Sequence, residues 1–221
     1  YFGVKAAREY CKGREGGIIW HTQGSGKSLT MVWLAKWLKE NVQGSRVLIL
    51  TDRTELDEQI EKVFNGVDEQ IHRANSRQDL IDSLNANSDW LICSLIHKFD
   101  TSIEEIPSAL PDDFSAKGEI FVMIDECHRT QSGKMHRAMN EMLPDDATIL
   151  GFTGTPLMEA EKRSTLETFG PYIHTYKYDE AVADKVILDL RYEARKIDQS
   201  LSSPEKVDQW FDRKTEGLND V

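Results

Sequence analysis

Residues 21–28 read HTQGSGKS, and they directly follow the apolar run GIIW at positions 17–20. A loop that binds phosphate groups has the pattern Gly-x-x-x-x-Gly-Lys-Ser/Thr between a buried strand and a helix. His21 stands where that pattern has its first glycine, and the remaining positions match. A flexible Gly/Ser linker has a similar composition, so the segments around this stretch have to decide between the two interpretations.

Short apolar runs recur along the chain and alternate with amphipathic stretches. Because the runs are apolar at consecutive positions, they are typical of parallel strands that are covered on both faces. The alternation with helices predicts an α/β fold of the RecA-like type, with a mostly parallel sheet and helices on both faces. The predicted strands cover 17–20, 46–51, 89–95, 119–125 and 147–153, and the predicted helices cover 27–40, 56–64 and the region around Leu80.

The predicted helix over 27–40 is apolar nearly all round, so we expect it to be buried, with Trp33 and Trp37 filling the core or an interface. Prolines and acidic residues over 100–118 predict a solvated surface loop. We expect a nucleotide-binding domain over 1–168, its closing strands and a linker over 169–199, and a C-terminal helix or linker over 200–221.

The residue types in the first motif suit a nucleoside triphosphate. Glycines let backbone N–H groups turn toward phosphate oxygens, and a helix that begins near Lys27 adds the positive end of its dipole. Lys27 is then placed to bind the β- and γ-phosphates, and the Ser28 hydroxyl to bind Mg²⁺. We therefore expect a site for ATP and Mg²⁺ built from Gln23, Gly24, Ser25, Gly26, Lys27 and Ser28.

A second motif, EIFVMIDECHR, brings Asp125 and Glu126 to the end of an apolar strand. Open parallel sheets bind ligands at the carboxyl ends of their strands, so these carboxylates should lie beside the phosphate loop. Asp125 is the candidate second ligand of Mg²⁺, and Glu126 the candidate base for the attacking water. Two unrelated surface acids at a strand end are the simpler alternative, and the position of the pair after a phosphate loop disfavours it.

A third motif, Thr153-Gly154-Thr155, also follows a buried strand directly. Small hydroxyl residues beside a glycine can connect the edge of the sheet that carries the acidic motif to a neighbouring surface. By itself the stretch could be any tight turn, and it carries weight only together with the other two motifs.

Together the three motifs resemble the first motor domain of superfamily 2 helicases and translocases. The segments HTQGSGKSLTMVWLAKWL, LTDRTELDEQI, ICSLIHKF, IDECHRTQSG, ILGFTGTPL and TFGPYIHTYKYDEAVADKVILDL resemble the motor segment of the R (restriction) subunit of type I restriction-modification enzymes. The resemblance covers most of residues 1–195. It implies a RecA-like P-loop domain of a hydrolase that couples ATP hydrolysis to translocation of double-stranded DNA, with endonuclease activity elsewhere in the polypeptide.

The same resemblance implies roles for individual residues. Lys27, Asp125 and Glu126 would be catalytic, and His128 would sense the γ-phosphate. Candidates for DNA contact are Thr51, Arg53, Thr54 and Ser94, with His97 and Lys98 less firmly assigned, although Arg53 could equally be a solvated residue at a helix start. Thr153, Gly154 and Thr155 would couple the nucleotide state to the grip on DNA.

The resemblance further implies partners and parts without a counterpart in this sequence. The partners are double-stranded DNA and the methylation and specificity subunits of a restriction complex. The parts are a purine-reading glutamine, expected just before Tyr1, and a second motor domain that carries an arginine finger. We therefore expect this chain to be a piece of a longer protein, with nucleotide binding but negligible turnover of its own.

Composition limits the remaining classes of function. The formal net charge of −11 argues against a basic face that coats nucleic acid, but it allows local phosphate contacts. The cysteines Cys11, Cys93 and Cys127 are far apart in the sequence, which favours a reducing cytoplasm over a disulfide framework. No apolar run approaches the roughly 18 residues that span a bilayer, so we expect no membrane association.

Two other functions stay open at this point. One is a DExH-type helicase of another group, acting on RNA. The other is a non-catalytic module that binds nucleotide or only docks partner subunits.

Overall fold

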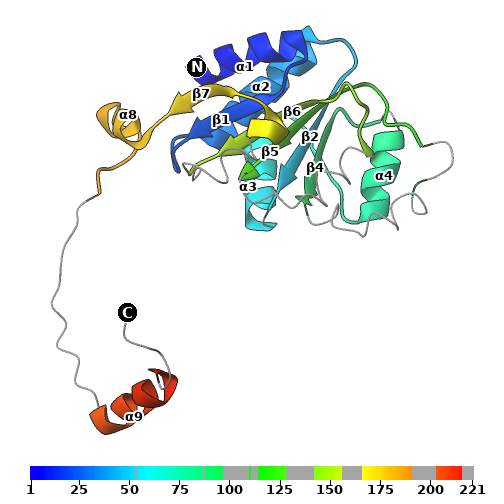
Figure 1. Ribbon diagram of the computed structural model, residues 1–221. Helices are drawn as coiled ribbons and strands as arrows, with labels where there is room; N and C mark the ends of the chain where they lie inside the picture. Colours follow the sequence, from blue (N-terminus) through cyan, green and yellow to red (C-terminus); the bar gives the residue numbers. More distant parts are fainter. Residues whose placement is uncertain are drawn as a thin grey trace. The chain divides into compact units, whose positions relative to one another are not determined.

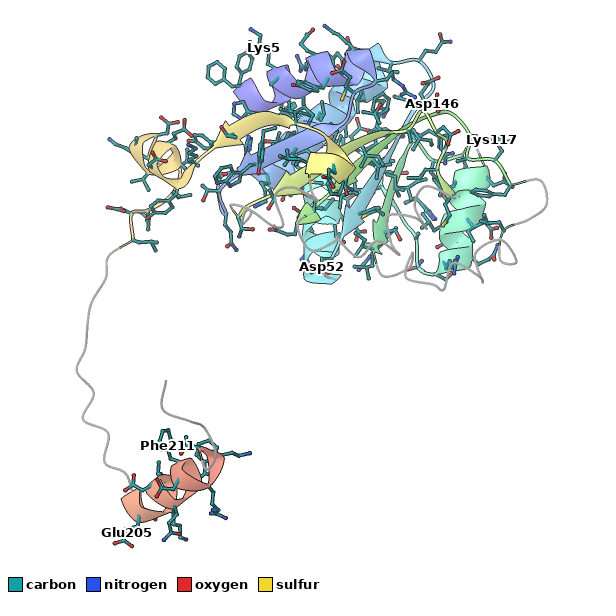
Figure 2. All side chains as sticks on the ribbon, in the orientation of Figure 1. Lys5, Asp52, Lys117, Asp146, Glu205 and Phe211 are labelled. Carbon is teal, nitrogen blue, oxygen red and sulfur yellow. The ribbon has the colours of Figure 1, made fainter. Side chains whose placement is uncertain are left out.

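The computed structural model describes residues 1–52, 54–86, 88–96, 110, 114–127, 142–155, 166–190 and 203–215, with the backbone alone described for 54–59 and 204. It divides into two compact units, Tyr1–Leu188 and Asp189–Val221. The first unit contains the sheet, and the described part of the second is mainly one helix, α9 (Pro204–Thr215), whose Val207, Trp210 and Phe211 are exposed (Figures 1 and 2).

The centre of the first unit is a seven-stranded sheet in the order β3-β4-β2-β5-β6-β1-β7. Every strand pair in this sheet is parallel, which confirms the predicted sheet type. The strands are β1 (Gly17–His21), β2 (Ser45–Thr51), β3 (His72–Arg73), β4 (Leu91–Leu95), β5 (Glu119–Ile124), β6 (Thr148–Thr153) and β7 (Tyr172–Tyr176).

Five helices of the first unit are described, and four of them, α1 to α4, cover the two faces of the sheet. Figure 1 shows α1 and α2 side by side over the sheet. Successive residues of β2 point to opposite faces, so Val47 packs with the cluster that contains α1, α2 and α3, and Leu48 with the cluster that contains α4. The helices are α1 (Phe2–Gly13), α2 (Lys27–Asn41), α3 (Thr54–Asn65), α4 (Arg77–Asn85) and α8 (Tyr178–Ala183).

The expectation that helix α2 is buried holds for one face of the helix only. Leu29 and Trp33 are 53% and 54% exposed, whereas Met31 and Leu34 are fully buried. Trp37, one turn further along the same face, is half-buried, and the guanidinium of Arg8 lies 5.3 Å from the centre of its ring. An apolar side chain therefore marks a core position on this helix only where the sheet or a neighbouring helix covers it.

The edge of the sheet where the strands begin is held by one buried arginine. Arg46 is 3% exposed, and its guanidinium donates hydrogen bonds to the carbonyl oxygens of Ser83, Leu84, Asp89 and Lys117 at 2.6–3.0 Å. Ser83 and Leu84 lie in the last turn of α4, where carbonyl groups lack helical partners. Arg46 thus ties the end of α4 to the segments that lead into β4 and β5.

Two sequence-based expectations fall partly outside the described residues. Of the loop over 100–118, only 110 and 114–118 are described, and of the closing strands and linker expected over 169–199, only 169–190 are described. Helix α1 and the short strand β3 were not predicted from the sequence. Among the described residues, no helix is both long enough and apolar enough to cross a membrane.

Candidate active site

The HTQGSGKS stretch forms a loop between β1 and α2. Gly24 and Gly26 have φ angles of 78° and 91°, a conformation that residues with a Cβ atom rarely adopt. Gly26 is the N-cap of α2, so the loop runs directly into the positive end of the helix dipole. The Ser25 backbone N–H and hydroxyl both donate to the carbonyl oxygen of Thr22, which closes the loop on itself.

A pocket of about 430 Å³ opens at this loop. It lies at the edge where the parallel strands end; Figure 2 shows Asp52, which follows β2, at this edge, and Lys117 and Asp146, which precede β5 and β6, at the opposite one. The residues around the pocket come from the loop, from helices α2 and α3, and from the end of β5. They are Gln23, Gly24, Gly26, Lys27, Ser28, Leu29, Val63, Asp125 and Glu126.

Asp125 and Glu126 enter the pocket through a strained turn after β5. The Asp125 N–H still donates to the carbonyl oxygen of Leu50 in β2, at 2.9 Å, so the sheet fixes this residue. Glu126 has a φ angle of 49°, which costs a residue with a side chain roughly 1–2 kcal/mol. Its N–H donates to Oδ1 of Asp125 at 3.0 Å, which helps to hold the turn.

The three motifs meet at Glu126. Its Oε1 lies 3.8 Å from Nζ of Lys27, and its Oε2 accepts a hydrogen bond from the Gly154 N–H at 3.4 Å. Gly154 is also the residue that leaves room for the lysine, because a Cβ atom on it would lie 2.8 Å from that Nζ. The structure therefore brings together the phosphate loop, the acidic turn and the Thr-Gly-Thr loop.

Asp125 is a strongly perturbed carboxyl group. It is 4% exposed, and burial, followed by the nearby charge of Glu126, raises its pKa from 3.8 to about 6, against the opposing effect of Lys27. A cation beside two adjacent carboxylates, one of them buried, favours their ionised form. The glycine conformations, the pocket and this acidic pair fit a triphosphate with Mg²⁺, and Ser28 and Asp125 are the residues that would hold the metal.

The Thr-Gly-Thr loop is hydrogen-bonded within itself. The Thr155 N–H donates to Oγ1 of Thr153 at 3.3 Å, and that hydroxyl donates to the carbonyl oxygen of Thr155 at 3.4 Å. Thr153 is buried and Thr155 is exposed. The loop therefore connects the interior next to Glu126 with the surface of the domain.

The residues predicted to contact DNA are only partly described. Thr51 and Ser94 have fully buried side chains. Their assignment as DNA contacts remains a prediction, and their burial counts against it. Arg53, His97, Lys98 and His128 lie outside the described residues, and of Thr54 only the backbone, at the start of α3, is described.

Sequence reasoning missed two apolar residues of the pocket. Leu29 and Val63 lie on different helices, and only the packing of α2 against α3 brings them to the same opening. The position of Leu29 two residues after Lys27 is a signal that could have placed it near the loop. Nothing in the sequence around Val63 indicates a site.

Comparisons with known proteins agree with this geometry. The sequence model of a family described as SWI2/SNF2 ATPase matches residues 1–221. A type I restriction enzyme endonuclease subunit from Staphylococcus saprophyticus is 37% identical over 78% of this chain and 19% of its own length. Another such subunit, from Haemophilus influenzae, is 32% identical over 89% of this chain and 21% of its own length. The chain thus spans about a fifth of the length of the curated relatives it matches.

Among solved structures, the type ISP restriction-modification enzyme LlaGI, a nuclease-deletion mutant in complex with a DNA substrate mimic, has the same fold. The TM-score is 0.60 at 15% sequence identity, and the match covers 98% of this chain and 22% of that one.

Proposed function

Since this chain belongs to the SWI2/SNF2 ATPase family, we propose that it is the first motor domain of a type I restriction enzyme endonuclease subunit. In that role it binds Mg·ATP and hydrolyses it to drive the movement of double-stranded DNA. The observation that carries the proposal is the convergence of Lys27, Glu126 and Gly154, because each residue comes from a different motif; Lys27 and Glu126 line one pocket, and Gly154 contacts both of them.

Binding of the triphosphate follows from the loop. Gly24 and Gly26 allow backbone N–H groups to face the phosphates, and Lys27 supplies a positive charge whose side chain is only 10% exposed. In the structure this charge is paired with Glu126. Phosphate oxygens are the stronger partner, since they carry more negative charge, so Lys27 would exchange Glu126 for them.

Hydrolysis needs a base that is free when nucleotide is present. The exchange by Lys27 releases Glu126, whose carboxylate can then orient a water molecule and accept its proton. Asp125 and Ser28 would hold Mg²⁺, which supplies charge neutralisation at the phosphates. Asp125 is buried, so its surroundings are shielded from bulk solvent. Electrostatic interactions are stronger in such a shielded site than in water.

Coupling to DNA would start at the hydrogen bond between Gly154 and Glu126. A change in the position of Glu126 shifts this bond, and the Thr153–Thr155 loop carries the shift to the exposed Thr155. The proposed partners of the longer protein are double-stranded DNA and the methylation and specificity subunits of a restriction complex. The names of the relatives and the DNA-bound structure support this part of the proposal.

The test uses the full-length protein that contains this chain. ATP turnover and displacement of a DNA-bound third strand are measured on linear double-stranded DNA, for the wild type, Glu126→Gln and the control Glu40→Gln, whose side chain is exposed on α2. We expect DNA-stimulated turnover that Glu126→Gln reduces by at least about 100-fold and Glu40→Gln leaves unchanged.

Two outcomes would contradict the proposal in different ways. Turnover stimulated by RNA but not by double-stranded DNA would assign the protein to another helicase group. Equal turnover in the wild type and Glu126→Gln would leave a nucleotide-binding or docking module.

A further inference from the structure

His21, which replaces the first glycine of the phosphate-loop pattern, is buried and pairs with the half-buried His174. Its Nε2 lies 2.9 Å from Nδ1 of His174, at hydrogen-bonding distance, and the two rings meet edge to face. His21 ends β1, and His174 lies in the middle of the adjacent β7, where it pairs with Ile19, two residues before His21. A glycine at position 21 would have no side chain for this contact.

Two further contacts join the first half of the phosphate loop to the same part of the chain, residues 172–188, called here the β7–α8 segment. The Thr22 N–H donates to the carbonyl oxygen of Tyr176 at 2.9 Å. At Gly24, a Cβ atom would lie 3.5 Å from Cγ2 of Ile187, so this side chain covers the loop from the side. Three successive parts of the loop, at positions 21, 22 and 24, therefore rest on one segment.

The histidine pair is also enclosed on its other side. Gly3 of α1 packs against it so closely that a Cβ atom there would lie 2.8 Å from Cε1 of His21. His21 is 5% exposed, and burial, followed by the neighbouring His174 and Lys27, lowers its pKa to about 4. A neutral imidazole in a fixed place can donate or accept one hydrogen bond toward His174 without the cost of a buried charge.

We propose that His21 and His174 are positioning residues for nucleotide binding, and that their hydrogen bond links the phosphate loop to the β7–α8 segment. Neither imidazole needs to touch the nucleotide. The bond fixes the conformation of the start of the loop. The glycines that follow then turn the backbone N–H groups toward the phosphates. When the loop closes on a triphosphate, the β7–α8 segment is ordered with it. This inference rests on the proposed function.

The test measures nucleotide affinity and amide hydrogen exchange in the protein, with and without magnesium and a slowly hydrolysed ATP analogue. In the wild type we expect slower exchange on nucleotide binding in two regions, the phosphate loop and residues 177–188. His174→Leu should weaken nucleotide binding about fivefold, as expected for one net hydrogen bond, and should abolish the change at 177–188 while the loop stays protected.

Three further variants separate positioning from folding. His174→Gln keeps a side chain that can donate and accept, so it should restore both the affinity and the protection at 177–188. Gly3→Ala keeps both histidines in the sequence, but its Cβ atom displaces the ring of His21, so it should resemble His174→Leu. Gly13→Ala, at the other end of α1, meets only the flexible side chain of Glu15 and should behave as the wild type.

The outcomes are distinguishable. Protection of the phosphate loop in the wild type without any change at 177–188 would overturn this inference and leave the proposed function intact. So would wild-type behaviour of His174→Leu in both measurements. Absence of nucleotide binding and of protection in both regions of the wild type would overturn the proposed function and the inference with it.

Discussion

Nζ of Lys27 lies 3.8 Å from Oε1 of Glu126, so the lysine of the candidate phosphate loop is paired with the candidate catalytic base. Both side chains are largely buried, at 10% and 22% exposure, which strengthens the pair relative to one at the surface. Nucleotide binding has to break this contact. Under the proposed function, the ion pair would weaken nucleotide affinity and keep the base inactive until phosphate replaces it.

The first prediction follows from this competition. Glu126→Gln removes the charge that competes for Lys27 but keeps the shape of the side chain, so it should bind Mg·ATP several-fold more tightly than the wild type. Titration with a fluorescent ATP analogue measures the affinity. Weaker binding in Glu126→Gln would show that the carboxylate assists nucleotide binding directly, against our account.

The second prediction concerns Asp125 and pH. Because the pKa of Asp125 is raised in the folded chain, the folded state is more stable at a pH at which the carboxyl is protonated in both the folded and the unfolded chain than at higher pH. This contribution is lost as the pH rises from 3.8 to about 6. The rise in pKa corresponds to about 3 kcal/mol of destabilisation above that range, as an upper limit. Asp125→Asn should therefore raise the thermal unfolding midpoint at pH 8, and the gain should shrink toward pH 4.

The exposed Asp145→Asn is the matched control for this measurement, and its midpoint should follow the wild type. If Asp125→Asn raises the thermal unfolding midpoint equally at pH 4 and pH 8, then the titration of the Asp125 carboxyl is not the cause of the increase.

Much of this arrangement could be predicted from the sequence. Consecutive apolar positions in β2 and β5 identified strands covered on both faces, and a parallel sheet brings the ends of such strands to one edge. The meeting of Lys27 with Asp125 and Glu126 then followed from topology. The exposed face of α2 could not be predicted, because a helix that is apolar all round does not indicate which side a neighbour covers. The His21–His174 contact depends on the register of β1 against β7, which neither residue reveals by itself.

The third prediction tests the role of Thr51. Its hydroxyl is fully buried and has no hydrogen-bond partner among the described residues. Thr51→Val should therefore raise the free energy of unfolding by up to about 1 kcal/mol, because an unsatisfied polar group is removed. In the full-length protein it should leave the DNA concentration needed for half-maximal ATP turnover unchanged. A marked increase in that concentration would restore Thr51 as a DNA contact.

The fourth prediction concerns the anchor at the opposite edge of the sheet. Arg46→Met removes a guanidinium that binds four carbonyl oxygens, some of which would stay buried without a partner. We expect a loss of at least about 3 kcal/mol in the free energy of unfolding, measured by urea denaturation. Arg8→Met, which loses only a contact with the half-buried Trp37, should cost about 1 kcal/mol or less. Equal losses in the two variants would contradict the anchoring role.

The most direct test of the central claim is the affinity of this chain for Mg·ATP with and without the Lys27 charge. Fluorescent-nucleotide titration of the wild type, Lys27→Ala and the control Lys5→Ala, whose side chain is exposed on α1, measures it. We predict that Lys27→Ala weakens binding about tenfold or more, as expected for the loss of charged hydrogen bonds to phosphate, and that Lys5→Ala binds as the wild type. Equal affinity in all three would contradict the assignment of the loop at residues 21–28 as the nucleotide site.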